Sequence, residues 1–138
     1  MDEKDVGRYP AAQIDTLLAN YEGLVQELPE LAAAWDEMDA MERSHHLAMF
    51  GQAWGDRHLL GALFKAGRLA PAQEERLAQL DQLLLERSRL ARQCYGLDSR
   101  RLMRLFLWGT PLSLSHQAVR LELDPATLSE MALAWAGT

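Results

Sequence analysis

The chain has 138 residues, of which 49% are hydrophobic and 25% are charged, and its formal net charge is −6 at pH 7. These values exclude a disordered chain, and the length allows a core that needs no disulfide or metal to hold it. The single cysteine excludes a disulfide within the chain, so we expect a protein of the reducing cytoplasm. We also expect no cofactor. No apolar run approaches the length of a membrane span, and we expect no membrane partner.

The composition predicts an all-α fold. Only eight residues are β-branched, and most of the others are Leu, Ala, Glu, Gln and Arg, which favour helices. We expect a flexible segment at residues 1–9, followed by a single domain over residues 10–138. This domain is predicted to be a bundle of about five to seven helices.

Prolines and glycines predict where the helices begin and end. Each of the five prolines is expected to begin a helix, because proline fits the first turn. Three glycines are expected to end helices as left-handed caps, and three polar residues to cap the starts. The prolines are Pro10, Pro29, Pro71, Pro111 and Pro125, the glycines Gly67, Gly96 and Gly109, and the N-caps Asp98, Ser113 and Asp124. The predicted helices span 10–28, 29–39, 40–66, 71–95, 98–108, 113–121 and 125–136.

The segment 40–66 has two interpretations. It is either one helix or two helices broken at Gly55 and Asp56, since glycine weakens a helix and aspartate can cap a new one. If the helix is continuous, small residues form a strip along which another helix could approach closely. The strip consists of Ala48, Gly51, Gly55 and Ala62.

The helices at 71–95 and 98–108 differ in their apolar pattern. The first has one leucine-rich side and one polar side, as expected of a helix in a bundle. The second is apolar nearly all round, so it should lie at the centre of the bundle or against a second subunit. The residues predicted for such an interface are Leu102, Met103, Phe106 and Trp108.

The last two predicted helices resemble a helix-turn-helix motif. The resemblance implies a helix pair of that geometry, but the helix that would read DNA carries Glu130 and no Lys or Arg. Two helices that close the bundle are the stronger interpretation. The matching residues are Ala118, Leu121, Leu123, Pro125, Thr127, Leu128 and Ser129.

Charge is sorted along the chain. Residues 1–60 carry four basic and twelve acidic side chains, whereas residues 61–121 carry ten basic and five acidic ones. Six arginines around residues 87–104 could bind phosphate groups or a protein partner. They could instead offset the helix dipole or pair with the acidic first half of the chain. The six are Arg87, Arg89, Arg92, Arg100, Arg101 and Arg104.

The sequence offers little for catalysis or metal binding. No nucleophile elbow or phosphate-binding loop occurs, and Cys94 lies on the apolar side of its predicted helix. Glu42 can share a helix face with either His45 or His46, and the three are weak metal candidates, because they supply only half of a two-metal site. We therefore expect a protein that is not an enzyme and holds no metal.

Two functional hypotheses follow. The first is a non-enzymatic helical protein for interaction or regulation, with a protein partner and self-association into a homodimer or larger homo-oligomer through apolar helix surface. The alternative is a nucleic-acid-associated protein that contacts phosphates through the arginines at 87–104.

Overall fold

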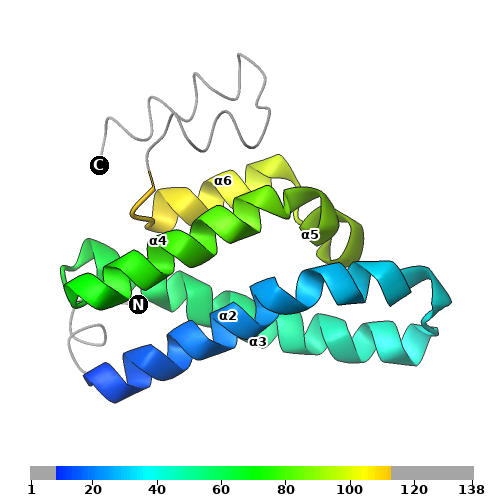
Figure 1. Cartoon of the computed structure of the whole chain (residues 1–138), viewed down its shortest axis with the longest axis horizontal. Helices are drawn as coiled ribbons and strands as arrows, with labels where there is room; N and C mark the ends of the chain where they lie inside the picture. The colour runs from blue at the N-terminus through cyan, green and yellow to red at the C-terminus, as the bar shows by residue number, and fades with distance from the viewer. Residues whose placement is uncertain (1–8, 113–138) are drawn as a thin grey trace, which may run out of the picture.

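The computed structural model describes residues 9–112, and all regular structure in this range is helical (Figure 1). The prediction of an all-α fold is confirmed for these residues. The predicted helices at 113–121 and 125–136, the helix-turn-helix-like pair and most of the segment 1–9 lie outside the described range. The elements are α2 (Ala11–Ala34), the short 3₁₀ helix η1 (Trp35–Glu37), α3 (Ala40–Lys65), α4 (Pro71–Glu86), α5 (Ser88–Tyr95) and α6 (Ser99–Trp108).

Helices α2 and α3 lie side by side and run in opposite directions, joined by η1 (Figure 1). α2 also contacts α4 and α5, and α3 contacts α6, so the core lies where these helices meet. Apolar residues at a spacing of three and four residues form the side of α2 that faces the core. The buried residues of this side are Ile14, Leu18, Tyr21, Leu24, Val25 and Leu28.

The prediction that Pro29 begins a helix is wrong, because α2 continues through Pro29 to Ala34. Proline has no N–H, so the carbonyl of Val25, four residues earlier, loses its usual helical donor. The Arg87 guanidinium supplies a donor instead, with Nη1 2.7 Å from the Val25 oxygen. A contact from a distant part of the chain thus satisfies the carbonyl that the proline would leave unpaired.

The segment predicted as one or two helices is one helix, α3. It begins with a capping box: Asp39 accepts from the Glu42 N–H at 2.8 Å, and Glu42 accepts from the Asp39 N–H. Neither Gly55 nor Asp56 interrupts it.

The segment 71–95, predicted as one helix, is two. It breaks at Arg87, whose φ and ψ of −102° and 18° are not helical, and α5 begins at Ser88. Neither proline nor glycine causes the break; it lies at the residue whose guanidinium turns to the α2 carbonyl. A tertiary contact therefore accompanies the end of α4.

Two of the three predicted glycine caps are confirmed, since Gly67 and Gly96 have φ of +69° and +68°. The prediction for Gly109 is wrong, because its φ of 164° is extended. Gly109 instead lies against Gly61 of α3, where a Cβ would be 2.2 Å from the Gly61 oxygen. Its missing side chain permits a close approach of two backbones. The predicted N-cap Asp98 is confirmed, with its carboxylate 2.9 Å from the Arg101 N–H.

No helix within residues 9–112 is both long enough and apolar enough to cross a membrane.

Candidate interaction surfaces

The arginines predicted as a stripe divide into two groups. Arg87 is half-buried and donates to the Val25 carbonyl, so it is part of the fold. The other five are exposed, and Arg89 has a polar contact of its own. The Arg101 guanidinium lies 3.5 Å from the Gly96 carbonyl oxygen. The structure thus separates one arginine that acts in folding from a set on the surface.

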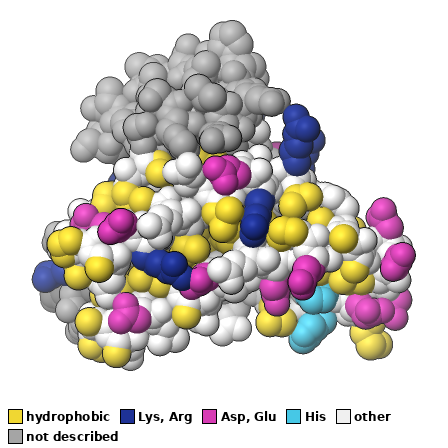
Figure 2. Space-filling view, viewed as in Figure 1, with side chains coloured by type: hydrophobic (Ala, Val, Ile, Leu, Met, Phe, Trp, Pro, Cys, Tyr) yellow, Lys and Arg dark blue, Asp and Glu magenta, His cyan; other side chains and the backbone are white. Residues whose placement is uncertain are grey.

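The ion pair that joins the acidic first half of the chain to the basic part is made by an arginine outside the predicted six. Within residues 9–112, Arg76 of α4 forms an ion pair with Glu22 of α2. Arg92, Arg100 and Arg104 have no carboxylate or hydrogen-bond partner in the same range. These three guanidinium groups are displayed. Figure 2 shows acidic side chains gathered instead at the end of α2 and α3 that η1 joins.

The apolar residues of α6 lie mostly in the core of the single chain. Leu102, Met103 and Phe106 are buried, and only Trp108, 47% exposed, remains at the surface. Of the two interpretations of this helix, burial within one chain fits the first, a place at the centre of the bundle.

The three metal candidates do not form a site. Glu42 belongs to the capping box of α3, and the rings of His45 and His46 pack edge to face with centroids 5.7 Å apart. No group of three metal-binding side chains occurs within the part of the chain that the structure describes. Burial raises the pKa of the Cys94 thiol, so this thiol stays protonated at neutral pH.

A buried ion pair fixes the inner side of α3. Arg57 of α3 and Asp81 of α4 are both fully buried and form two hydrogen bonds, at 2.8 Å from Nε and 2.6 Å from Nη2. The Tyr21 hydroxyl and the Thr110 hydroxyl also donate to the Asp81 carboxylate, at 2.7 and 2.6 Å. Arg57 Nη2 also donates to the Gly109 carbonyl at 2.7 Å. One carboxylate thereby joins α2, α3, α4 and the residues after α6.

The Arg57 guanidinium keeps its charge inside the protein. Desolvation alone lowers the pKa of Arg57, but the Asp81 carboxylate and Tyr21 outweigh it, and the pKa lies above its ordinary value. Burial, followed by the Asp81 carboxylate, raises the pKa of Tyr21 well above its ordinary value. The Arg57 carbon Cζ lies 5.6 Å from the Tyr21 ring centroid and 5.8 Å from that of Phe106, an arrangement that favours a cation.

Sequence reasoning missed this network, although a signal was present. Arg57 falls on the buried side of α3 between Ala53 and Leu60, and Asp81 falls between Leu80 and Leu84 in the leucine stripe. A charged residue at a helix position where the pattern expects an apolar one indicates a buried partner of opposite charge.

The solvent-facing side of α3 is different. We define the outer face of α3 as Met41, Ser44, Leu47, Ala48, Gly51 and Gly55, all of which are exposed. Their spacing of three and four residues places them along one side of the helix. From Ser44 to Phe64 the only charged residues are Asp56 and the buried Arg57. The outer face is thus an uncharged helical surface.

Exposed apolar side chains gather at this helix. Within residues 9–112, four large apolar side chains are exposed, and three of them, Met41, Leu47 and Met49, belong to α3. The fourth, Trp108, packs edge to face on His58 of α3 with ring centroids 6.2 Å apart. Apolar side chains concentrated on one element mark an interaction surface more strongly than scattered ones.

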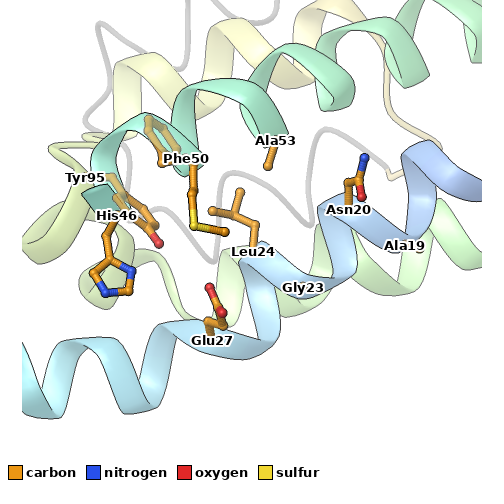
Figure 3. A pocket seen from close by; sticks show the side chains of 10 residues that line it. Ala19, Asn20, Gly23, Leu24, Glu27, His46, Phe50, Ala53 and Tyr95 are labelled. Atoms are coloured by element: carbon orange, nitrogen blue, oxygen red, sulfur yellow. The ribbon is translucent and has the colours of Figure 1, made fainter. Parts of the chain in front are cut away.

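A groove follows the seam between α2 and α3. Its central hollow has a volume of about 230 Å³ and is bordered by Gly23 and Glu27 on α2 and by His46 and Phe50 on α3 (Figure 3). The Phe50 ring stacks on Tyr95 of α5, with centroids 4.3 Å apart. Figure 3 shows residues of α2 along one side of the hollow and residues of α3 along the other.

Comparison of the chain with protein-family models, with curated proteins and with solved structures found no match.

Proposed function

We propose that this chain is a non-enzymatic protein-interaction module that self-associates through the outer face of α3. The observation that carries this proposal is that two of the four large exposed apolar side chains of residues 9–112 lie on one uncharged helix side, Met41 82% and Leu47 43% exposed. Apolar surface of this kind is covered when two copies meet.

Two glycines support the same surface. Gly51 and Gly55 each weaken the helix relative to alanine by up to about 1 kcal/mol. Within the described residues, a Cβ at either position would meet nothing within 4 Å, so the single chain gains no packing from their absence. A second helix that approaches closely would use that space.

Charge complementarity favours a second copy in antiparallel orientation. Exposed acids lie at the N-terminal end of α3, at Glu37, Asp39 and Glu42, and exposed bases at the other end, at Lys65 and Arg68. A two-fold axis at the middle of α3 places the acidic end of one copy against the basic end of the other. Such self-complementarity is what a two-fold interface requires.

The oligomeric state tests the proposal. One helix face buries less area than a standard interface, so we expect dimers that dissociate in the micromolar range. Sedimentation velocity across a concentration series should show a monomer–dimer equilibrium. Gly51→Glu should abolish the dimer and leave the fold intact. Ala33→Glu, which adds the same charge at an exposed position of α2, should leave the dimer unchanged. A monomer at every concentration would refute the proposal.

A charge swap tests the orientation. Arg68→Glu and Glu37→Lys should each weaken the dimer, and the double variant should restore it, since opposite charges again face one another. If the double variant is weaker than either single variant, the antiparallel arrangement is wrong.

The second candidate function is nucleic-acid binding, favoured by the displayed guanidinium groups of Arg92, Arg100 and Arg104. Binding of DNA or RNA by this patch should fall steeply with salt, because each neutralised phosphate releases counterions. Arg100→Glu combined with Arg104→Glu should abolish it, and Arg68→Glu should leave it unchanged. Absence of binding at low salt would eliminate this function.

A further inference from the structure

The groove between α2 and α3 is longer than its central hollow. A second hollow of about 150 Å³ shares Asn20, Met49 and Ala53 with it, and a third of about 200 Å³ shares Glu27 and His46. Because neighbouring hollows share walls, the three form one groove. Along α2 it extends from Asn20 to Leu31, a distance of about 16 Å at 1.5 Å per residue.

The charges around this groove have one sign. Three carboxylates line it, those of Glu27, Glu30 and Asp56, and no Lys or Arg does. Within residues 9–112, neither Glu27 nor Glu30 has a basic partner. Asp56 accepts a neutral hydrogen bond from Asn20 Nδ2 at 2.9 Å and has no basic partner in the same range. The groove is therefore acidic, and no basic side chain of residues 9–112 neutralises it.

The floor of the groove is apolar and adaptable. Leu24, Phe50 and Ala53 are buried beneath it, and the side chains of Met38 and Met49 border it. Methionine is flexible and polarisable, so surfaces rich in it accept varied apolar partners. Tyr95 contributes a ring, and burial together with the Glu27 carboxylate raises the pKa of this phenol. The Tyr95 hydroxyl therefore stays neutral beside Glu27.

Gly23 lies in the wall of the groove, exposed in the middle of α2. Within the described residues, a Cβ at Gly23 would meet nothing within 4 Å, so the packing of α2 does not require glycine there. A glycine that weakens the helix without helping the packing keeps the groove open to a ligand.

We propose that this groove binds an amphipathic basic helix of a partner protein, with apolar side chains on the floor and Lys or Arg at the carboxylates of Glu27, Glu30 and Asp56. In helical bundles, a third helix packs in the groove between two others. A helix that binds in such a groove is held by apolar side chains spaced one turn apart. A length of about 16 Å accommodates about three turns. This proposal does not rest on self-association, since the groove and the outer face of α3 are separate surfaces.

The test uses a fluorescein-labelled peptide of about twelve residues that forms an amphipathic helix. Leu recurs every three or four residues along one side of this helix, and Lys recurs at the same spacing along the other. Fluorescence anisotropy with the full chain should show saturable binding. The same peptide with Glu in place of Lys should not bind. A scrambled peptide of identical composition, which has no apolar helix side, should bind much more weakly.

Variants of the protein separate groove binding from unspecific attraction to an acidic chain. Gly23→Leu fills the groove, leaves the net charge unchanged and improves the helix propensity of α2, so it should abolish binding in a folded protein. Ala33→Leu adds an apolar side chain at an exposed position of α2 outside the groove, so it should have no effect. Glu27→Gln should weaken binding about tenfold, because it removes a charge-assisted contact.

Methionine methyl NMR then locates the peptide. The signals of Met38 and Met49 should shift on titration, whereas that of Met41 on the outer face of α3 should not. Equal binding by the wild type and Gly23→Leu, or a shift of Met41 alone, would overturn the proposal. The proposal would also be overturned if the wild type did not bind the peptide and Gly23→Leu lost self-association. The groove would then be occupied by a second copy of the chain. Binding by a monomeric Gly51→Glu variant would support the groove even if the proposed dimer fails.

Discussion

The two sides of α3 use the same kinds of residue in opposite ways. On the inner side, Gly61 is required, because a Cβ would be 3.0 Å from both Arg57 Nη1 and the Gly109 oxygen. On the outer side, Gly51 and Gly55 have open space around them. The inner side buries a charge and pairs it, whereas the outer side exposes apolar groups and leaves them uncovered.

The difference shows which side of α3 serves folding and which is available for binding. Each special residue of the inner side is explained by a contact within the chain. The outer side carries Gly51 and Gly55, where a Cβ would meet nothing within 4 Å among residues 9–112, and Met41, which is 82% exposed. Glycine costs helix stability, and exposed apolar surface costs solubility. Four substitutions test this contrast.

Asp81→Ala should have the largest effect. It leaves the Arg57 guanidinium charged and buried without its partner, which costs about 3–5 kcal/mol of unfolding free energy. Urea unfolding followed by circular dichroism measures this loss. Glu75→Ala, which removes an exposed carboxylate of the same helix, should change the stability little. Equal stability of both variants would show that the buried pair does not hold the fold.

Gly109→Ala should destabilise the protein by about 1–3 kcal/mol, since its Cβ would lie 2.2 Å from the backbone oxygen of Gly61 and the two segments must separate. Thermal unfolding should show a lower midpoint. Gly67→Ala provides a comparison, because it strains a left-handed residue where a Cβ meets no neighbouring atom. An unchanged midpoint in Gly109→Ala would mean that the contact with α3 is not tight.

Tyr21→Phe should cost about 1–2 kcal/mol, because Asp81 loses one of its donors. It should also change the response to alkali. The raised pKa of Tyr21 means that its contribution is present in full below about pH 10 and is lost as pH rises through the folded-state pKa. Above about pH 10 the variant should therefore lose stability with pH less steeply than the wild type. Tyr95 and Cys94, whose pKa values are also raised, keep part of the slope. Identical slopes would contradict the assignment.

Gly55→Ala should have the smallest effect and the opposite sign. Measured on dilute monomer, it should raise the unfolding free energy by up to about 1 kcal/mol, because alanine favours the helix and its methyl group meets no neighbour. The same substitution should weaken the dimer. A loss of monomer stability would show that the outer face is already packed.

Local pattern predicted much of the fold. The apolar stripe of α2, the Asp98 cap, and the glycine caps at Gly67 and Gly96 all depend on residues within a few positions of one another. The failures depend on distant contacts. The Val25 carbonyl that Pro29 leaves without a donor is bonded by Arg87, 62 residues beyond Val25. The extended Gly109 lies against Gly61 of α3.

The candidate surfaces were only partly predictable. The sequence indicated small residues along α3, and Ala48, Gly51 and Gly55 are exposed there. The groove could not be predicted, because it needs the register of α2 against α3. Of the residues predicted as an interface on α6, Leu102, Met103 and Phe106 are buried and Trp108 is exposed.

The contact between Arg87 and α2 has a consequence for the order of folding. The α4–α5 segment donates to two carbonyls of α2, from Arg87 to Val25 and from Gln93 to Ala32 at 3.3 Å. The end of α2 that follows Pro29 therefore reaches its final hydrogen bonding only after the chain has been synthesised beyond these side chains. In the nascent protein, the Val25 and Ala32 carbonyls of α2 therefore gain these donors only after α4 and α5 have been made.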